Sequence, residues 1–292
     1  MLELAAPIRL YWDMDPGQPA DDYVERVCAD AVAMRLLAIH LDDPGATLSA
    51  GTRLILERLL GPGRAILLTL NPDAAGILDQ QTVAAVRHLY IRVTSPRMLT
   101  QVFSIRDRLA PLSVGISMAL PDIPLADVPQ MVLDAAATGI REIHFPMQRL
   151  TAGAACWAPS PSELDTCSRQ LLGHAIPDQV RLTIHDPFIW RSFHAGLPFP
   201  NGGCQAANTM LYLAPDGQLY SCPLVPVALG NLHDLSLLEL ATGNKKQMLR
   251  EQIRGVPPIC GACPDLASCH AGCRGRAMVL GGWMANDPAC GR

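Results

Sequence analysis

Residues 260–290 read CGACPDLASCHAGCRGRAMVLGGWMANDPAC and hold five of the chain's ten cysteines. The first 150 residues hold a single cysteine, Cys28. Within the crowded stretch, Cys260 and Cys263 form a CxxC pair. That spacing lets one turn present two thiolates to one metal centre. The stretch therefore predicts a metal-binding module at the C-terminal end of a cysteine-poor chain.

The overall composition is that of a globular protein. The chain has 292 residues, with 49% hydrophobic and 17% charged residues and a net charge of -4. This balance gives no basic surface for nucleic acid and no cationic run for a membrane. The N-terminus lacks the basic and apolar regions of a signal peptide, so we expect a cytoplasmic protein. In that compartment clustered cysteines are metal ligands more often than disulfides.

Up to about residue 195, short β-rich runs alternate with helical patterns. Such alternation predicts a parallel sheet with right-handed crossovers. Six such units favour an open or partial (β/α) barrel over a doubly wound sheet. The expected strands are 8–14, 36–41, 65–70, 88–93, 112–120 and 142–147, with a further strand at 180–186.

The helices between these strands carry start and stop signals. In the clearest case, Ser160 is an expected N-cap, with Pro161 in the first turn and Glu163 completing a capping box. The other helices are expected to begin at Asp21 or Asp22 and run through 34, and to lie within 47–61, 73–87, 96–110 and 124–139.

Composition changes near residue 195, where GLPFPNGG (196–203) predicts a hinge. Residues 210–222, MLYLAPDGQLYSC, then predict a hairpin with a Pro-Asp-Gly turn. The remainder reads as loop-rich, with few large apolar residues, so metal would stabilise it. We therefore expect two domains, a barrel over 1–195 and a cysteine-rich module over 196–292.

Spacing alone leaves the metal open. Zinc and iron–sulfur centres both require about four protein ligands. Seven cysteines lie after residue 200, which is one short of two such centres. Cys204 and Cys222 flank the hairpin and would converge if its ends lie close. Cysteines in one run can also serve two different clusters.

The full pattern resembles the seven-cysteine SPASM domain, the C-terminal module of many radical SAM peptide-modifying enzymes. Cys204 is followed by Gly217 and Cys222, and then by the five cysteines of the opening stretch. The resemblance implies two auxiliary 4Fe-4S clusters. It assigns one cluster to Cys260, Cys263, Cys269 and Cys290, and the other to Cys204, Cys222 and Cys273.

The second of these clusters lacks a fourth cysteine. Some SPASM relatives add an eighth cysteine about six residues before the first, and here that position is Pro198. The resemblance therefore implies either an open iron or a ligand of another type. His194 and His270 are nearby in sequence and are the candidates.

The first part of the chain resembles the partial barrel of radical SAM enzymes but departs from it at the cofactor site. Those enzymes carry CxxxCxxC just after the first strand, where this chain reads WDMDPGQPADDYVERVC. Cys28 cannot replace three thiolates and is expected to pack on a helix face. The Gly-Gly-Glu that usually follows the second strand is also missing, so S-adenosylmethionine is not expected as a cofactor.

Other chemical groups in the first part have ordinary explanations. Asp13, Asp15, Asp42 and Asp43 would lie at the C-terminal ends of two adjacent strands, where barrel active sites are found. They could bind a metal, but turn and helix-cap roles are the favoured reading. We expect Cys156 and Cys167 to be ordinary buried thiols, with the alternative that one of them is the missing cluster ligand.

The resemblance implies a non-initiating partner of a radical SAM/SPASM enzyme in peptide modification, presenting a peptide or relaying electrons. It is similar to the SPASM-domain protein of the GeoRSP system, which accompanies such an enzyme and a PqqD-like peptide-binding protein. Two alternatives stay open at this point. One is an enzyme using an open cluster iron or the acidic barrel mouth as a Lewis acid, and the other is a zinc-stabilised interaction protein.

Overall fold

The computed structural model describes residues 3–150, 155–174 and 176–292. Its sheet has ten strands within these residues, in the order β10-β9-β8-β1-β2-β3-β4-β5-β6-β7. The strands are β1 (Arg9–Asp13), β2 (Ala38–Asp43), β3 (Ala65–Leu70), β4 (His88–Arg92), β5 (Ser113–Ser117), β6 (Glu142–Phe145), β7 (Arg181–Ile184), β8 (Met210–Leu213), β9 (Gln218–Tyr220) and β10 (Ala228–Asn231).

Helices follow the strands along the chain, as the alternating pattern predicts. Those of the first part are α1 (Asp22–Ala33), α2 (Ala50–Leu59), α3 (Pro72–Ala75), α4 (Gln80–Ala85), α5 (Leu99–Leu109), α6 (Val128–Ala137), α7 (Pro161–Leu171) and α8 (Pro187–Phe193). Those of the second part are α9 (Leu237–Thr242), α10 (Asn244–Arg254), α11 (Pro258–Gly261), α12 (Leu266–Cys269) and α13 (Arg274–Gly281). The short 3-10 helices are η1 (Pro96–Met98), η2 (Leu120–Asp122) and η3 (Pro200–Gly202).

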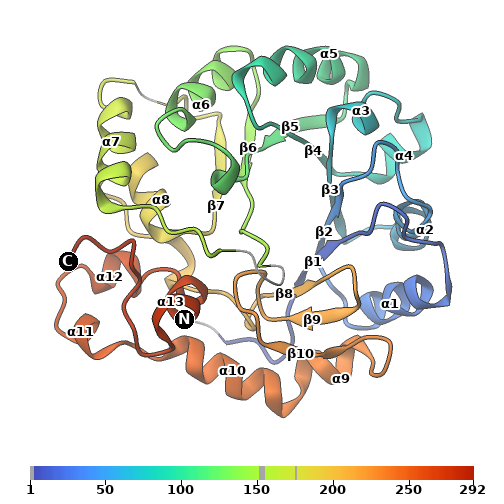
Figure 1. Ribbon diagram of the computed structural model, residues 1–292. Helices are drawn as coiled ribbons and strands as arrows, with labels where there is room; N and C mark the ends of the chain where they lie inside the picture. The colour runs from blue at the N-terminus through green and yellow to red at the C-terminus, as the bar shows by residue number, and fades with distance from the viewer. Residues whose placement is uncertain (1–2, 151–154, 175) are drawn as a thin grey trace.

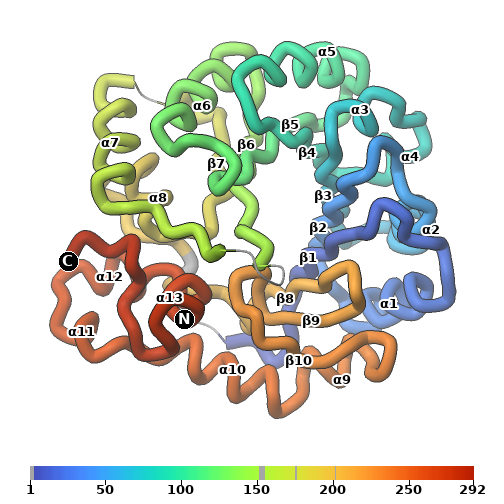
Figure 2. The backbone as a smooth tube through the Cα atoms, viewed as in Figure 1, coloured from blue at the N-terminus to red at the C-terminus, as the bar shows by residue number. Residues whose placement is uncertain are grey.

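Strands β1 to β7 are parallel neighbours and form an open barrel. Figure 1 shows helices α1 to α8 arranged around the outside of this sheet, with the C-terminal part between α8 and α1. The tube in Figure 2 follows the same ring-shaped path. The predicted fold class, a partial parallel barrel followed by a small cysteine-rich module, is confirmed.

The sheet curves far enough for side chains of distant strands to meet on its inner face. Tyr11 on β1 stacks on His40 of β2, with ring centroids 4.4 Å apart. His40 in turn lies 6.1 Å from His144 of β6. The Tyr11 hydroxyl is 3.1 Å from Nε2 of His185, just after β7. The barrel interior is therefore packed with a layer of aromatic and histidine rings.

The C-terminal module continues the barrel sheet. Strand β8 pairs in parallel with β1, and β9 returns antiparallel to β8, as expected for the 210–222 hairpin. The hairpin turn needs Gly217, whose φ of +80° is a conformation that favours glycine. One sheet thus crosses the predicted domain boundary near residue 195, and the boundary itself stays a prediction.

Two expectations about secondary structure are wrong. The single helix expected over 73–87 is split into α3 and α4, because Asp79 accepts a hydrogen bond from Thr82 N at 2.7 Å and starts a new helix. The part after the hairpin is not loop-rich. Ser236 and Glu239 form a capping box that starts α9, and α10 follows directly. Leu237, Leu240 and Leu249 of these helices are buried and belong to the same apolar core as the barrel residues.

The described residues contain no helix that is long and apolar enough to cross a membrane.

Candidate metal centres

The structure gathers the seven predicted ligands into two separate cavities. The first, of about 450 Å³, is lined by Cys204, Cys222 and Cys273, and we call it the three-thiol cavity. The second, of about 460 Å³, is lined by the other four cysteines and is the four-thiol cavity. Its thiols are those of Cys260, Cys263, Cys269 and Cys290. This grouping matches the one that the SPASM resemblance implies, while ligation itself stays a prediction.

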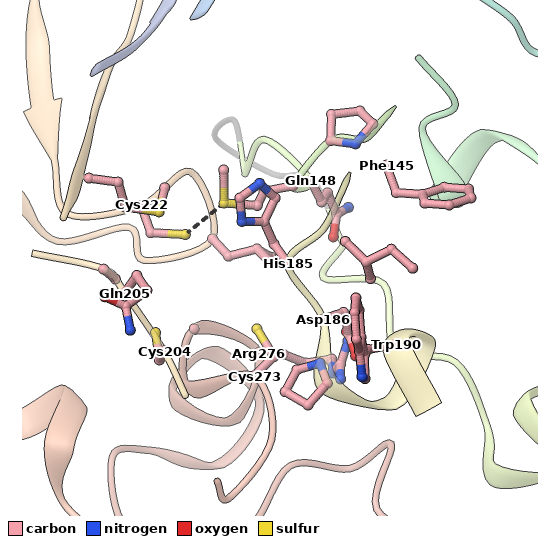
Figure 3. Close-up of a pocket in the computed structure, with 18 of the residues that line it drawn as sticks. Phe145, Gln148, His185, Asp186, Trp190, Cys204, Gln205, Cys222, Cys273 and Arg276 are labelled. Atoms are coloured by element: carbon pink, nitrogen blue, oxygen red, sulfur yellow. Dashed lines mark hydrogen bonds and ion pairs between the residues drawn. The ribbon is translucent and has the colours of Figure 1, made fainter. Parts of the chain in front are cut away.

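The three-thiol cavity lies where the module meets the barrel. Figure 3 shows Cys204, Cys222 and Cys273 around one space, with His185 and Asp186 from the end of β7 facing them. Residues from both parts of the chain therefore form its walls.

The hairpin brings two of these thiols together. Ala207 N donates to Ser221 O at 3.3 Å, so the segments that carry Cys204 and Cys222 lie side by side. The predicted convergence of the hairpin ends is confirmed. Cys222 also contacts the barrel, because its Sγ lies 3.6 Å from Sδ of Met147 after β6.

Cys273 is held by a buried carboxylate. Its backbone N donates to Asp287 Oδ2 at 2.6 Å, at the start of α13. Arg276 pairs with both oxygens of Asp287 at 2.7 Å and also with Asp186 of the barrel. Asp287 and Arg276 are only 1% and 2% exposed. This pair fixes Cys273 against the barrel wall.

The four-thiol cavity is built from tight turns near the C-terminal end. Cys263 N donates to Cys260 O at 3.1 Å, which is the turn expected for the CxxC pair. Cys269 ends α12, and Cys290 N donates to Asp287 O at 2.9 Å. Asp287 therefore contacts both thiol sites, through its side chain at Cys273 and through its carbonyl at Cys290.

Burial makes the thiols poor acids on their own. It raises the pKa of Cys222 to about 12 and also raises the pKa values of Cys204 and Cys273. The positive charge of Arg274 partly offsets this effect, because it favours a lower pKa for Cys204 in the three-thiol cavity and for Cys260 in the four-thiol cavity. Thiolates in these cavities need a strongly cationic centre beside them, which a metal cluster supplies.

The size of the two cavities bears on the kind of metal centre that each can hold. A tetrahedral zinc with Zn–S bonds of about 2.3 Å places its sulfurs about 3.8 Å apart. Among the described residues, no three or more His, Cys, Asp or Glu side chains converge closely enough to hold one metal ion. Both cavities are also much larger than one ion. Each cavity therefore has room for a multi-iron cluster as well as for a single ion.

Neither histidine expected as a fourth ligand lines the three-thiol cavity. His194 ends α8 and packs on Trp190, with ring centroids 3.9 Å apart. His270 has a φ of +48° after α12 and lies against Gly203. The histidine that does line this cavity is His185, which the sequence gave no reason to select.

The barrel mouth contains a network of ion pairs instead of thiols. Arg149 donates to both oxygens of Asp13 at 2.8 and 2.9 Å and lies 3.4 Å from Asp42. Arg92 pairs with Asp42 from the other side, and Tyr212 donates to Asp13 at 3.0 Å. Burial would lower the pKa of Arg149, but Asp13 raises it above its ordinary value, so the guanidinium stays charged.

The remaining candidates in the first part are structural. Asp43 is fully buried and accepts from Ser49 N and Thr52 Oγ1 at 2.9 and 2.7 Å, and Asp15 accepts from Gly17 N at 2.8 Å. These two fit the expected turn and cap roles, whereas Asp13 and Asp42 form ion pairs.

The three cysteines outside the two cavities also have structural surroundings. Cys28 and Cys167 are buried on helix faces, as predicted. Cys156 is only half-buried, which differs from the expectation of a buried thiol.

Residues 204–264 match the family model of SPASM, an iron-sulfur cluster-binding domain. Streptococcus suis SuiB bound to S-adenosylmethionine has a similar structure, with a TM-score of 0.69 and 13% identity over 99% of this chain and 78% of SuiB. SuiB bound to its precursor peptide SuiA gives a TM-score of 0.71 and 12% identity, covering 99% and 77%. Native anSMEcpe with bound AdoMet gives 0.63 and 14%, covering 96% and 94%.

None of the curated proteins compared matches the chain. Identities this low show the fold alone. The chain is thus an α/β protein with the fold of radical SAM enzymes. Its C-terminal part contains a SPASM iron-sulfur domain.

Proposed function

We propose that the protein is a non-initiating iron–sulfur partner of a radical SAM/SPASM enzyme in peptide modification. Two 4Fe-4S clusters, one in each thiol cavity, would give it electron-carrying capacity. Its own role is to present a peptide or to relay electrons, as the resemblance to the GeoRSP system implies. A PqqD-like peptide-binding protein is the expected third component, and the cytoplasm the expected compartment.

The observation that carries this proposal is that ion pairs, and not thiols, occupy the barrel mouth. Radical SAM enzymes hold their initiating cluster on three thiolates after the first strand. In this chain that edge of the sheet holds Asp13, Asp42, Arg92 and Arg149 in compensated ion pairs. Cys28 lies on the buried face of α1 and is 2% exposed. The segment between β1 and α1 thus offers no thiolate for a SAM-cleaving cluster.

The same ion pairs weigh against the alternative of a metal at the acidic barrel mouth. Asp13 and Asp42 are already neutralised by Arg149 and Arg92. A cation binding there would have to displace two guanidinium groups that make charge-assisted hydrogen bonds. The chain itself is therefore better suited to binding and electron transfer at the SPASM domain.

The peptide part of the proposal has support from a similar structure. SuiB has been solved with a precursor peptide bound. In the present chain the three-thiol cavity is also lined by aromatic side chains, including Phe145, Trp157 and Trp190. Such a mixed apolar and polar cavity can bind part of a peptide.

The test is a reconstitution followed by a binding measurement. Anaerobically reconstituted protein should contain about eight irons per chain and form no 5′-deoxyadenosine from S-adenosylmethionine under reducing conditions. An intact radical SAM/SPASM enzyme is the positive control for that assay. The protein should then bind an intact radical SAM/SPASM enzyme, or that enzyme's peptide, in calorimetry.

Three results would overturn the proposal. Formation of 5′-deoxyadenosine by this chain alone would contradict the non-initiating role. Binding of neither the enzyme nor the peptide would contradict the partnership. Zinc-containing protein that takes up no iron would replace the iron–sulfur assignment with the zinc-stabilised alternative.

A further inference from the structure

We infer that His185 is the fourth ligand of the cluster in the three-thiol cavity, through its Nδ1 atom. The inference rests on the proposed iron–sulfur function and makes it more specific. It replaces the open iron and the two histidines, His194 and His270, that sequence proximity suggested.

The first argument is position. His185 follows β7 and lines the same cavity as Cys204, Cys222 and Cys273. Figure 3 shows its ring beside Cys222, with Cys204 and Cys273 across the same space. A cubane cluster with three protein thiolates has one iron without a protein ligand, and His185 lines the cavity in which that iron would lie.

The second argument is the hydrogen bond on the other ring nitrogen. His185 Nε2 lies 3.1 Å from the hydroxyl of Tyr11, which is 1% exposed. Metal-binding histidines typically donate their second N–H to such a partner, which fixes the tautomer and the ring orientation. With Nε2–H donating to the Tyr11 oxygen, Nδ1 carries the lone pair that binds iron.

The third argument is that the carboxylate and carboxamide side chains in the cavity are already engaged. Asp186 caps α8 through Oδ1 and pairs with Arg276 through Oδ2. Gln148 accepts from Trp157 N at 2.8 Å and donates to Ala155 O at 2.9 Å. Within the described residues, His185 Nδ1 makes no such bond.

Gln205 is engaged as well. Its Oε1 accepts from Asn208 Nδ2 at 3.1 Å, and its Nε2 donates to Gly203 O at 3.2 Å. The indoles that line the cavity are donors only and cannot bind iron. An imidazole nitrogen is a well-established substitute for a cysteine on cluster iron. His185 is therefore the side chain that best completes the three-thiol set.

The test uses pulsed EPR of the full-length, reconstituted and reduced protein. A directly bound imidazole gives a strong ¹⁴N coupling, which becomes a ¹⁵N coupling when the protein is grown with ¹⁵N-histidine. The coupling should be present in the wild type and in the matched control His194→Ala, and lost in His185→Ala. His185→Cys should keep the cluster, lose the coupling and shift its reduction potential downward, because a thiolate replaces a neutral ligand.

The possible failures are distinguishable. A wild-type cluster with no histidine nitrogen coupling would overturn the assignment while leaving the iron–sulfur proposal intact. Coupling that survives in His185→Ala but disappears in His194→Ala would transfer the ligand role to the other histidine. Absence of iron from the wild type would overturn the proposed function and, with it, the assignment of His185 as a ligand. The labelling experiment on the wild type tests for a histidine ligand even if a variant fails to fold.

Discussion

Removing the Asp287 carboxylate should destabilise the SPASM part and empty both thiol cavities. Asp287→Ala deletes the paired hydrogen bonds to Arg276 and the acceptors for Cys273 N and Ala289 N, at 2.6 and 3.0 Å. Since Asp287 is 1% and Arg276 2% exposed, water cannot easily replace these bonds.

The magnitude follows from this burial. Breaking a buried ion pair by removing one partner costs about 3–5 kcal/mol, because the other charge is left uncompensated. For a chain of this size, that corresponds to a loss in melting temperature on the order of 10 °C. Each backbone N–H left without an acceptor adds a further cost. Arg276 keeps its contact with Asp186, which places the expected loss toward the lower end of the range.

The assay is chemical unfolding of the cluster-free protein, together with iron content after reconstitution. Asp265→Ala is the matched control, since Asp265 is an acidic residue of the same module whose pair with Arg292 is 2.9 Å long but 29% and 58% exposed. Such a pair contributes about 0–1 kcal/mol. The double variant Asp287→Ala with Arg276→Met should be less destabilised than Asp287→Ala alone, because no buried charge remains.

The reasoning is refuted if Asp287→Ala unfolds within about 1 kcal/mol of the wild type and takes up its full iron content. It is equally refuted if the control Asp265→Ala is destabilised as much as Asp287→Ala. A loss of stability with unchanged iron would contradict only the link from Asp287 to the thiol positions.

Three further outcomes are expected. Replacing Cys260 and Cys263 by alanine should remove about half of the iron and leave the other cluster's EPR signal, while Cys28→Ala, as the control, should keep the full iron content. Gly272→Ala should lower iron binding, because the residue has a φ of +75° and a new Cβ would lie 2.6 Å from the Asp287 side chain. Burial holds the pKa of His144 well below its ordinary value, so the fold should lose stability as pH falls below about 6.5, where the unfolded chain takes up the proton. His144→Gln should show a shallower loss in urea titrations over that pH range, and an unchanged slope would contradict this explanation.

The fold of the barrel was accessible from the sequence because its strands are short apolar runs bounded by turn residues. The run AILLTL forms β3 over the expected residues, and Ser160 caps α7 as its capping box predicted. The split between α3 and α4 was missed although Asp79 is a good N-cap, because an apolar periodicity spans both helices. The capping box of Ser236 and Glu239 is likewise a local sequence signal for the start of α9.

The candidate site can be predicted only in part from the sequence. The spacing of the cysteines, read with the SPASM resemblance, separated the two thiol groups that the structure places in different cavities. His185 could not be found in this way, because it precedes Cys204 by a long segment and carries no motif. It reaches the cavity because the sheet curves until the end of β7 faces the hairpin formed by β8 and β9.

That curvature also gives the barrel a structural role beside the thiol cavities. Strand β8 pairs with β1, so the hairpin that carries Cys204 and Cys222 is positioned by the barrel's first strand. The end of β7 supplies Asp186, which holds Arg276 and through it Asp287 and Cys273. Removing the barrel would therefore expose the hairpin edge and take away one wall of the three-thiol cavity. The ion pairs at the barrel mouth join the ends of β1, β2 and β4 and so strengthen the same scaffold.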